Sequence, residues 1–179
     1  MRAAISSKMQ ASAAKMTKKP KSRAVLVLHG PNLNLLGARE PELYGRDTLE
    51  SINRRLAAAA RAAGVRLEAL QSNHEGVLVD RVQQAKSDGI GFILLNPAGF
   101  TYSSIALRDA LTAVQIPFIE VHISNIHARE PWRAHSHFTE VAVGTILGLG
   151  SRGYDLALGY AIARLTGTPR GTRPGRRGA

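Results

Sequence analysis

The chain has no cysteine among its 179 residues. Disulfide bridges, thiolate nucleophiles and thiolate metal ligands are therefore excluded. Long hydrophobic runs are also missing, because no apolar stretch approaches the roughly 20 residues that a membrane-spanning helix needs. These absences lead us to expect a soluble, cytoplasmic protein with no membrane partner.

Acidic residues are absent from both ends of the sequence, although the chain as a whole carries a formal net charge of +11. Residues 1–23 contain seven Lys or Arg residues and residues 164–179 contain five, which leaves 12 basic and all 13 acidic residues to the middle. Clustered positive charge is typical of nucleic-acid binding, but the middle segment is almost neutral. We therefore expect no specific nucleic-acid partner for the folded part.

Both basic ends lack apolar periodicity and cannot bury enough surface to offset the entropy of ordering. We expect disordered tails at 1–23 and 164–179 around one folded domain at 24–163, whose length suits a single core. The first segment also resembles a transit peptide in composition, and a solubilising extension or a misassigned start remains open as an alternative.

Short apolar runs alternate with helical patterns from residue 24 onward, which is typical of a parallel sheet covered on both faces. Strands are predicted at 24–29, 65–71, 90–95, 116–122 and 141–147. Helices are predicted from the cap at Asp47-Thr48 to Gly64, and at 76–88, 102–114 and 152–164. The fold class is therefore α/β, with a flavodoxin-like, doubly wound, five-stranded parallel sheet in a single domain.

The loops after strands one, three and four should converge at the carboxyl edge of such a sheet. The first loop, 29–45, carries Asn32, Arg39 and Tyr44. A guanidinium beside the phenol would favour the tyrosinate and provide a base, although both side chains also suit an ordinary surface loop. Asn32 after Gly-Pro is either a binding group or a turn former.

A second candidate group ends strand four. Glu120 and His122 lie two residues apart on one strand face, so the carboxylate can hydrogen-bond the imidazole and favour its protonated form as a general acid. A structural histidine is the alternative. Ser124 and Asn125 offer donors for a carboxylate or a cap for the next turn.

Neither a metal site nor a dinucleotide site is favoured. Four histidines fall within sixteen residues, but their spacing does not match a helical His-x-x-x-His pair. The run Gly148, Gly150 and Gly153 matches a dinucleotide fingerprint, yet no acidic residue follows about twenty positions later. Tight packing of a helix on the sheet explains these glycines better.

The chain resembles the type II 3-dehydroquinate dehydratases over roughly residues 24–163. The resemblance is carried by several motifs: Gly30-Pro31-Asn32-Leu33-Asn34, Arg39-Glu40-Pro41, Tyr44-Gly45, Gln71-Ser72-Asn73-His74-Glu75-Gly76, Asn96-Pro97-Ala98-Gly99, Ile105-Ala106-Leu107-Arg108-Asp109-Ala110, Glu120-Val121-His122-Ile123-Ser124-Asn125 and His127-Ala128-Arg129-Glu130. It implies dehydration of 3-dehydroquinate to 3-dehydroshikimate through an enolate, without metal, other cofactor or Schiff base. The reaction would serve aromatic biosynthesis or quinate breakdown.

The resemblance also implies roles for catalytic residues. Tyr44, activated by Arg39, would abstract the proton next to the ketone. Asn32 would hold a water that stabilises the enolate. His122, oriented by Glu120, would protonate the departing hydroxyl.

Substrate binding is implied by the same resemblance. The carboxylate would meet Ile123 and Ser124 near Asn96, and Arg133 would contact the ring hydroxyls. Asp109 would reach a neighbouring subunit, since the family forms homo-oligomers in which trimers assemble into dodecamers. Loop 37–46 would close over the site.

The chain departs from the family pattern at Tyr102, where a substrate-binding histidine is usual. A tyrosine replaces that donor with a longer, uncharged one, so we expect catalysis to survive with an altered affinity. The competing hypothesis from another class is a flavodoxin-like module that binds a nucleotide or flavin. It would need phosphate-binding amides in the first loop, where Pro31 offers none.

Overall fold

The computed structural model describes residues 23–38 and 47–167. Five strands form its sheet: β1 (Ala24–His29), β2 (Arg66–Gln71), β3 (Phe92–Asn96), β4 (Phe118–His122) and β5 (Gly144–Leu147). Four helices accompany them: α2 (Leu49–Ala62), α3 (Glu75–Ala85), α4 (Ile105–Val114) and α5 (Arg152–Thr166). Short 3-10 turns occupy η1 (Leu33–Leu35), η2 (Ala98–Tyr102), η3 (Ile126–Ala128) and η4 (Pro131–Arg133).

The strands are all parallel and lie in the order β2-β1-β3-β4-β5. This is the flavodoxin-like order, so the predicted fold class is confirmed. The chain winds outward in one direction from β1 to β2 and in the other from β3 to β5, which places the switch in strand order between β1 and β3. There His29 is paired in register with Asn96.

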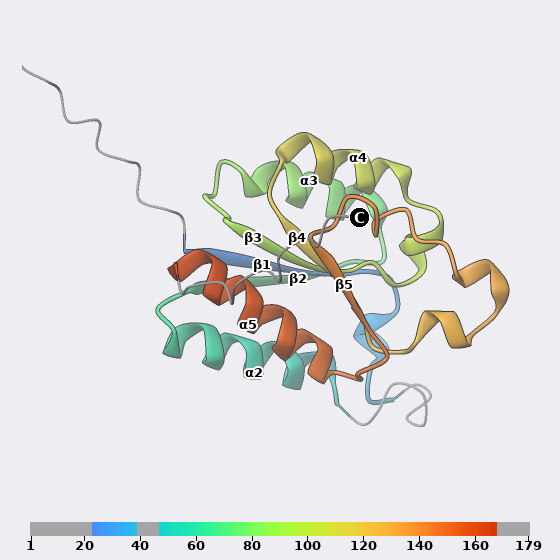
Figure 1. Cartoon of the computed structure of the whole chain (residues 1–179), viewed down its shortest axis with the longest axis horizontal. Helices are drawn as coiled ribbons and strands as arrows, with labels where there is room; N and C mark the ends of the chain where they lie inside the picture. Colours follow the sequence, from blue (N-terminus) through green and yellow to red (C-terminus); the bar gives the residue numbers. More distant parts are fainter. Residues whose placement is uncertain (1–22, 39–46, 168–179) are drawn as a thin grey trace, which may run out of the picture.

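Helices cover both faces of the sheet, with α3 and α4 on one side and α2 and α5 on the other (Figure 1). Alternation along the buried strands divides the core accordingly. Val25, Val27 and Leu94 pack with α2 and α5, whereas Leu26 and Leu28 pack with α3 and α4. His29 and Asn96 continue the first alternation, and Glu120 and His122 follow Phe118 on the second face.

The helix predicted at 102–114 is wrong in its first turn. Ser104 caps α4 by accepting a hydrogen bond from the Leu107 amide at 3.1 Å, so the helix begins at Ile105 and the preceding residues form the 3-10 turn η2. The Thr48 cap is confirmed, because its side chain accepts from the Ser51 amide at 3.1 Å.

The other predicted boundaries differ by a few residues. The strands predicted at 90–95 and 116–122 each begin two residues later, the one predicted at 141–147 begins at Gly144, and the helix predicted at 76–88 ends at Ala85. The last helix extends to Thr166, so the domain boundary predicted after residue 163 falls inside it. Leu165 is buried against the sheet, which explains the extension.

The glycine run after β5 serves packing, as the sequence indicated. A Cβ on Gly153 would lie 3.2 Å from Ile146 Cγ2 and 3.5 Å from Val121 Cγ1, so the absence of a side chain lets α5 approach β5 and β4. Gly148 has a φ of +80° and passes close to Asn125. Asn125 in turn caps η3 by accepting from the His127 amide.

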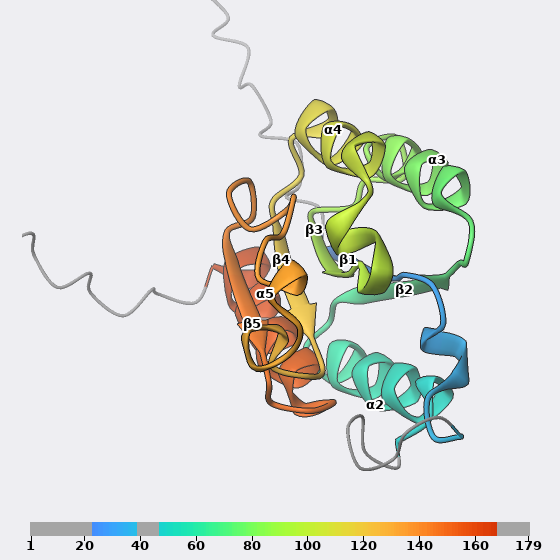
Figure 2. The same ribbon diagram turned by 90° about the vertical axis from the view of Figure 1, so that its right-hand side faces the viewer.

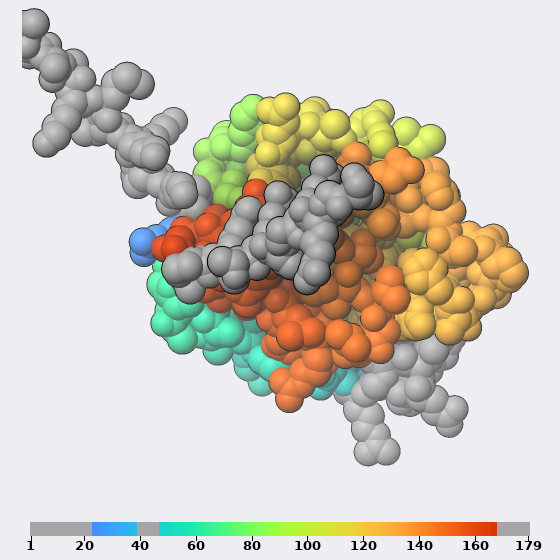
Figure 3. All heavy atoms as spheres, viewed as in Figure 1, coloured from blue at the N-terminus to red at the C-terminus, as the bar shows by residue number. Residues whose placement is uncertain are grey.

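The carboxyl ends of the strands meet on one side of the molecule. Figure 2 looks onto this side, with the blue η1 turn, the green η2 turn and the orange segment 123–140 arranged around the strand ends. The same orange segment forms the right-hand end of the space-filling view in Figure 3. Within the described ranges, no helix is long and apolar enough to cross a membrane.

Candidate active site

The loops after β1 and β3 touch at the switch point because Gly30 has no side chain. Its amide donates to the Asn96 carbonyl at 2.8 Å, and a Cβ on Gly30 would lie 2.1 Å from the Pro97 carbonyl oxygen. Any other residue would push these loops apart. The predicted convergence of loops therefore depends on one backbone contact.

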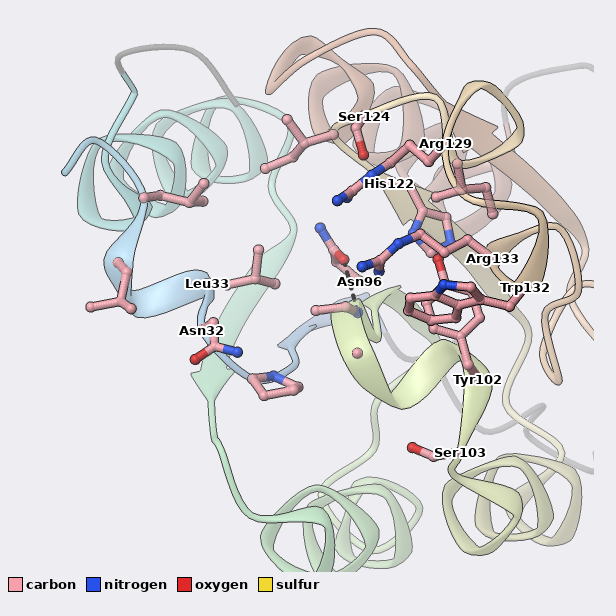
Figure 4. Close-up of a pocket in the computed structure, with 17 residues that line it drawn as sticks. Asn32, Leu33, Asn96, Tyr102, Ser103, His122, Ser124, Arg129, Trp132 and Arg133 are labelled. Carbon is pink, nitrogen blue, oxygen red and sulfur yellow. Dashed lines mark hydrogen bonds between the residues drawn. The ribbon is translucent and has the colours of Figure 1, made fainter. Parts of the chain in front are cut away.

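A cavity of about 450 Å³ opens beside this contact. Its walls come from the loops after β1, β3 and β4, as shown in Figure 4. The lining residues are Pro31, Asn32, Leu33, Leu35, Leu36, Asn96, Ala98, Gly99, Tyr102, Ser103, His122, Ile123, Ser124, Ile126, Arg129, Trp132 and Arg133. The volume suits a small molecule.

His122 and Glu120 form a buried pair at one wall. His122 Nε2 donates to Glu120 Oε1 at 2.7 Å, and the two side chains are 5% and 0% exposed. Because Nε2 is used by the carboxylate, Nδ1 is the ring nitrogen left for a ligand. The pair has the geometry that the sequence predicted.

Two hydroxyl groups complete the surroundings of Glu120. Ser136 Oγ donates to its Oε1 at 2.6 Å, and Thr139 Oγ1 donates to Oε2 at 2.7 Å. Burial opposes ionisation of Glu120, but hydrogen bonds from His122, Ser136 and Thr139 outweigh it and hold the pKa of the carboxyl below its usual value. The carboxylate therefore stays charged while it accepts the hydrogen bond from His122.

Cationic and aromatic side chains line the cavity beside His122 (Figure 4). The guanidinium carbon of Arg133 lies 4.0 Å from the ring centre of Trp132 and 5.6 Å from that of Tyr102. The two rings meet edge to face with centres 5.1 Å apart. Figure 4 shows the Arg133 and Arg129 side chains extending into the cavity above these rings. Two cations on one wall suit an anionic ligand.

Asn32 lies across the cavity from His122 (Figure 4). Its φ of 65° is left-handed, which asparagine tolerates better than most residues, so it does form the turn. Its backbone N–H donates to Asn73 Oδ1 at 2.9 Å, and its side chain lines the cavity. The turn-forming alternative for Asn32 is therefore confirmed, and its role as a binding group stays a prediction.

The structure brings together seven of the predicted site residues in the cavity lining: Asn32, Asn96, Tyr102, His122, Ile123, Ser124 and Arg133. Glu120 lies directly behind His122. Asp109 does not line this cavity; it is on α4 with a 69% exposed side chain, 3.8 Å from Arg108. Arg39 and Tyr44 lie outside the described residues.

Several residues at the site were not assigned a role from the sequence. Ser136 and Thr139 follow a stretch without periodicity, so nothing in the pattern linked them to Glu120. Arg129 and Trp132 come shortly before the predicted Arg133 in the sequence, and this closeness in sequence was the available signal. Among residues 23–38 and 47–167, no three His, Asp or Glu side chains are grouped closely enough to hold a metal ion.

Comparisons with known proteins agree with this geometry. The family model described as "Dehydroquinase class II" matches residues 23–162. The 3-dehydroquinate dehydratase of Chromobacterium violaceum is 62% identical over 145 residues, covering 81% of this chain and 93% of that protein. The corresponding protein of Hahella chejuensis is 60% identical over 144 residues, covering 80% and 98%.

Solved structures give the same result. The type II dehydroquinase of Butyrivibrio crossotus superposes with a TM-score of 0.76 at 40% identity, covering 78% of this chain and 97% of that one. The type II dehydroquinase of Propionibacterium acnes gives 0.75 at 42% identity, covering 79% and 97%. From the match over most of its length and the similarity to these relatives, the chain belongs to the class II dehydroquinase family.

Proposed function

We propose that this protein is a hydro-lyase that converts 3-dehydroquinate to 3-dehydroshikimate and water, the activity for which its relatives are named. The observation that carries the proposal is the buried Glu120–His122 pair, which opens into a cavity lined by Arg129 and Arg133. Elimination of water from a hydroxy acid needs a proton donor for the leaving hydroxyl and a positively charged surface that attracts the anionic substrate. The cavity supplies both kinds of group.

In the proposed mechanism, the Tyr44 phenolate removes the proton next to the ketone, and Arg39 stabilises the phenolate. Electrons from the broken C–H bond form an enolate, and a water held by Asn32 stabilises its oxygen. When the enolate collapses, the C1–O bond breaks and the conjugated ketone forms. Arg39 and Tyr44 are assigned from the sequence motif.

His122 acts in the second step. With Nε2 bound to Glu120, the imidazolium form of His122 transfers its Nδ1 proton to the departing hydroxyl, releasing water. The fixed carboxylate keeps the ring in one orientation through both protonation states. Ser136 and Thr139 act on the reaction through Glu120.

Recognition follows from the groups around the cavity. Ile123 and Ser124 bind the carboxylate next to Asn96, and Arg133 binds ring hydroxyls. Tyr102 supplies a hydroxyl where relatives have a histidine, which changes affinity more than turnover. Asp109, exposed on α4, completes a neighbouring subunit's site in a dodecamer built from trimers.

A direct ultraviolet assay tests the activity. Incubation with 3-dehydroquinate should produce the absorbance of the conjugated product, equally with and without a chelator. No absorbance gain would refute the proposal, and loss of the gain with the chelator would refute the metal-independent mechanism.

The role of Tyr44 has its own test. Tyr44→Phe should remove nearly all turnover while substrate binding stays measurable, and turnover within tenfold of the parent would exclude Tyr44 as the base.

Borohydride added with substrate should leave the enzyme active, because no imine forms. Residues 24–163 contain only one lysine, Lys86, so a reduced adduct would be easy to locate.

A further inference from the structure

Behind the cavity lies a buried polar network that the proposed mechanism does not use. Tyr154 of α5 and His29 of β1 are both fully buried, and the Tyr154 hydroxyl lies 2.9 Å from His29 Nδ1. The same hydroxyl accepts a hydrogen bond from Asn96 Nδ2 at 3.0 Å. On the far side, His29 Nε2 contacts Asn53 Oδ1 of α2 at 2.9 Å. The network thus joins two helices to the two central strands.

Only one assignment of hydrogens to the donor and acceptor atoms fits this network. Asn53 Oδ1 is an acceptor, so His29 Nε2 carries the hydrogen and Nδ1 does not. Burial lowers the pKa of His29 to about 4, so the ring is neutral near pH 7. The Tyr154 hydroxyl must then donate to Nδ1, and its oxygen accepts from Asn96.

This order fixes the side chain of Asn96. Its Nδ2 donates inward to Tyr154, and its Oδ1 accepts from the Ala98 amide at 3.2 Å. The two ends of an amide have nearly the same shape, so only their hydrogen-bond partners select one of the two orientations. With Nδ1 as its acceptor, the Tyr154 hydroxyl offers Asn96 only its oxygen, which suits Nδ2 and opposes the flipped orientation, as the Ala98 N–H does at the other end of the amide.

We propose that Tyr154 and His29 are positioning residues, which hold the Asn96 amide in the single orientation that binds substrate at the cavity wall. The inference rests on the proposed function, in which Asn96 lies beside the substrate carboxylate. Tyr154 and His29 touch no substrate and act through Asn96. A purely structural role would need no such ordered chain, because an apolar pair would fill the same space without burying polar groups.

Tyr154→Phe tests the proposal, because it removes one oxygen and keeps the ring. We expect KM for 3-dehydroquinate to rise about tenfold, which corresponds to loss of roughly one hydrogen bond, while kcat stays within about twofold of the parent. Tyr160→Phe is the matched control on the same helix, where the side chain is 41% exposed. It should leave both constants unchanged. An unchanged KM in Tyr154→Phe would overturn the proposal.

A double-mutant cycle identifies the route of the effect. In an Asn96→Ala background, Tyr154→Phe should raise KM no further, because the group that it positions is gone. An equal rise in both backgrounds would show that Tyr154 acts elsewhere and would overturn the proposal.

His29→Leu gives an independent variant that decides the matter if Tyr154→Phe fails to fold. It removes the acceptor for the hydroxyl, so it should raise KM in the same way, and an unchanged KM would count against the proposal.

The activity of the parent enzyme distinguishes a failure of this proposal from a failure of the proposed function. If the parent does not convert 3-dehydroquinate the proposed function fails, whereas a converting parent with silent variants refutes only the positioning role.

Discussion

At the scale of single residues, two buried ionisable groups are kept in opposite states. Glu120 receives hydrogen bonds from three side chains and is held charged. His29 is surrounded by neutral partners and is held uncharged, because burial lowers its pKa to about 4. Glu120 therefore places a negative charge beside His122, whereas His29 adds no charge to the network behind Asn96.

Ser136→Ala should shift the acid side of the pH profile of kcat. Loss of the 2.6 Å hydrogen bond raises the pKa of Glu120 toward its ordinary value, so the carboxylate protonates at higher pH. His122 then loses its charged hydrogen-bond acceptor. A hydrogen bond to a charged group is worth about 1.5–3 kcal/mol, so the acid limb should move up by about one to two pH units. Initial rates between about pH 4 and pH 9 measure it across the range in which carboxyl and imidazole groups titrate. The exposed Ser87→Ala serves as control, and an unmoved limb in Ser136→Ala would contradict the role.

His29 makes the stability of the fold depend on pH. Its pKa is about 4 in the folded state against 6.5 in the unfolded state, so the unfolded chain binds the proton first as pH falls. The free energy of unfolding should therefore drop by about 3 kcal/mol from this group as pH falls from 6.5 to about 4. Urea unfolding of the parent and of His29→Leu measures the difference. If the two stability curves run parallel, His29 does not titrate as described.

At the scale of elements, the sequence predicted each strand and α-helix that the structure describes, and the errors lie at their ends. A short continuous apolar run and the Thr48 cap are local signals, which is why β1 and α2 were placed well. The start of α4 depends on which residue caps the helix, and in the fold Ser104 does so by accepting from the Leu107 amide. The contact of Gly30 with Pro97 was equally hidden from local patterns, because the two residues are distant in the sequence.

Gly30→Ala should disrupt the junction between the loops after β1 and β3. Its Cβ would lie 2.1 Å from the backbone oxygen of Pro97, which cannot move as a flexible side chain would. We expect the free energy of unfolding to fall by about 2–3 kcal/mol, measured by urea unfolding.

Gly159→Ala in α5 is the matched control for this change. A Cβ added to Gly159 would meet nothing within 4 Å, so alanine should stabilise the helix by about 0.5–1 kcal/mol. Equal effects of the two substitutions would show that the tight contact at Gly30 does not decide the outcome.

At the scale of the whole molecule, the site lies in one α/β domain, and α5 is the last helix of its described residues. Deletion of residues 1–22 and 168–179 should leave turnover unchanged, because the family match and the cavity lie between them. Deletion from Arg164 onward should instead lower the free energy of unfolding by about 2 kcal/mol, because it removes Leu165 from the core. Assays and thermal melts of both truncations measure this. Loss of turnover in the shorter deletion would assign the ends a role in the activity.

The sequence by itself determined the class of fold and most of the site. Its strand pattern indicates a doubly wound sheet, and such a sheet brings the loops carrying Asn32, Asn96 and His122 to one edge. The Glu120–His122 pair was also predictable, because two residues on one strand face need no distant contact to meet.

Only the tertiary structure decided what surrounds these residues. His29 and Tyr154 are separated by 125 positions, and Ser136 reaches Glu120 across 16 positions that show no periodicity. Local patterns report which face of an element is apolar, but they do not report which polar groups from other elements will meet there. Those partners set the charge of Glu120, the neutrality of His29 and the orientation of Asn96, because each depends on burial and hydrogen bonds that exist only in the packed fold.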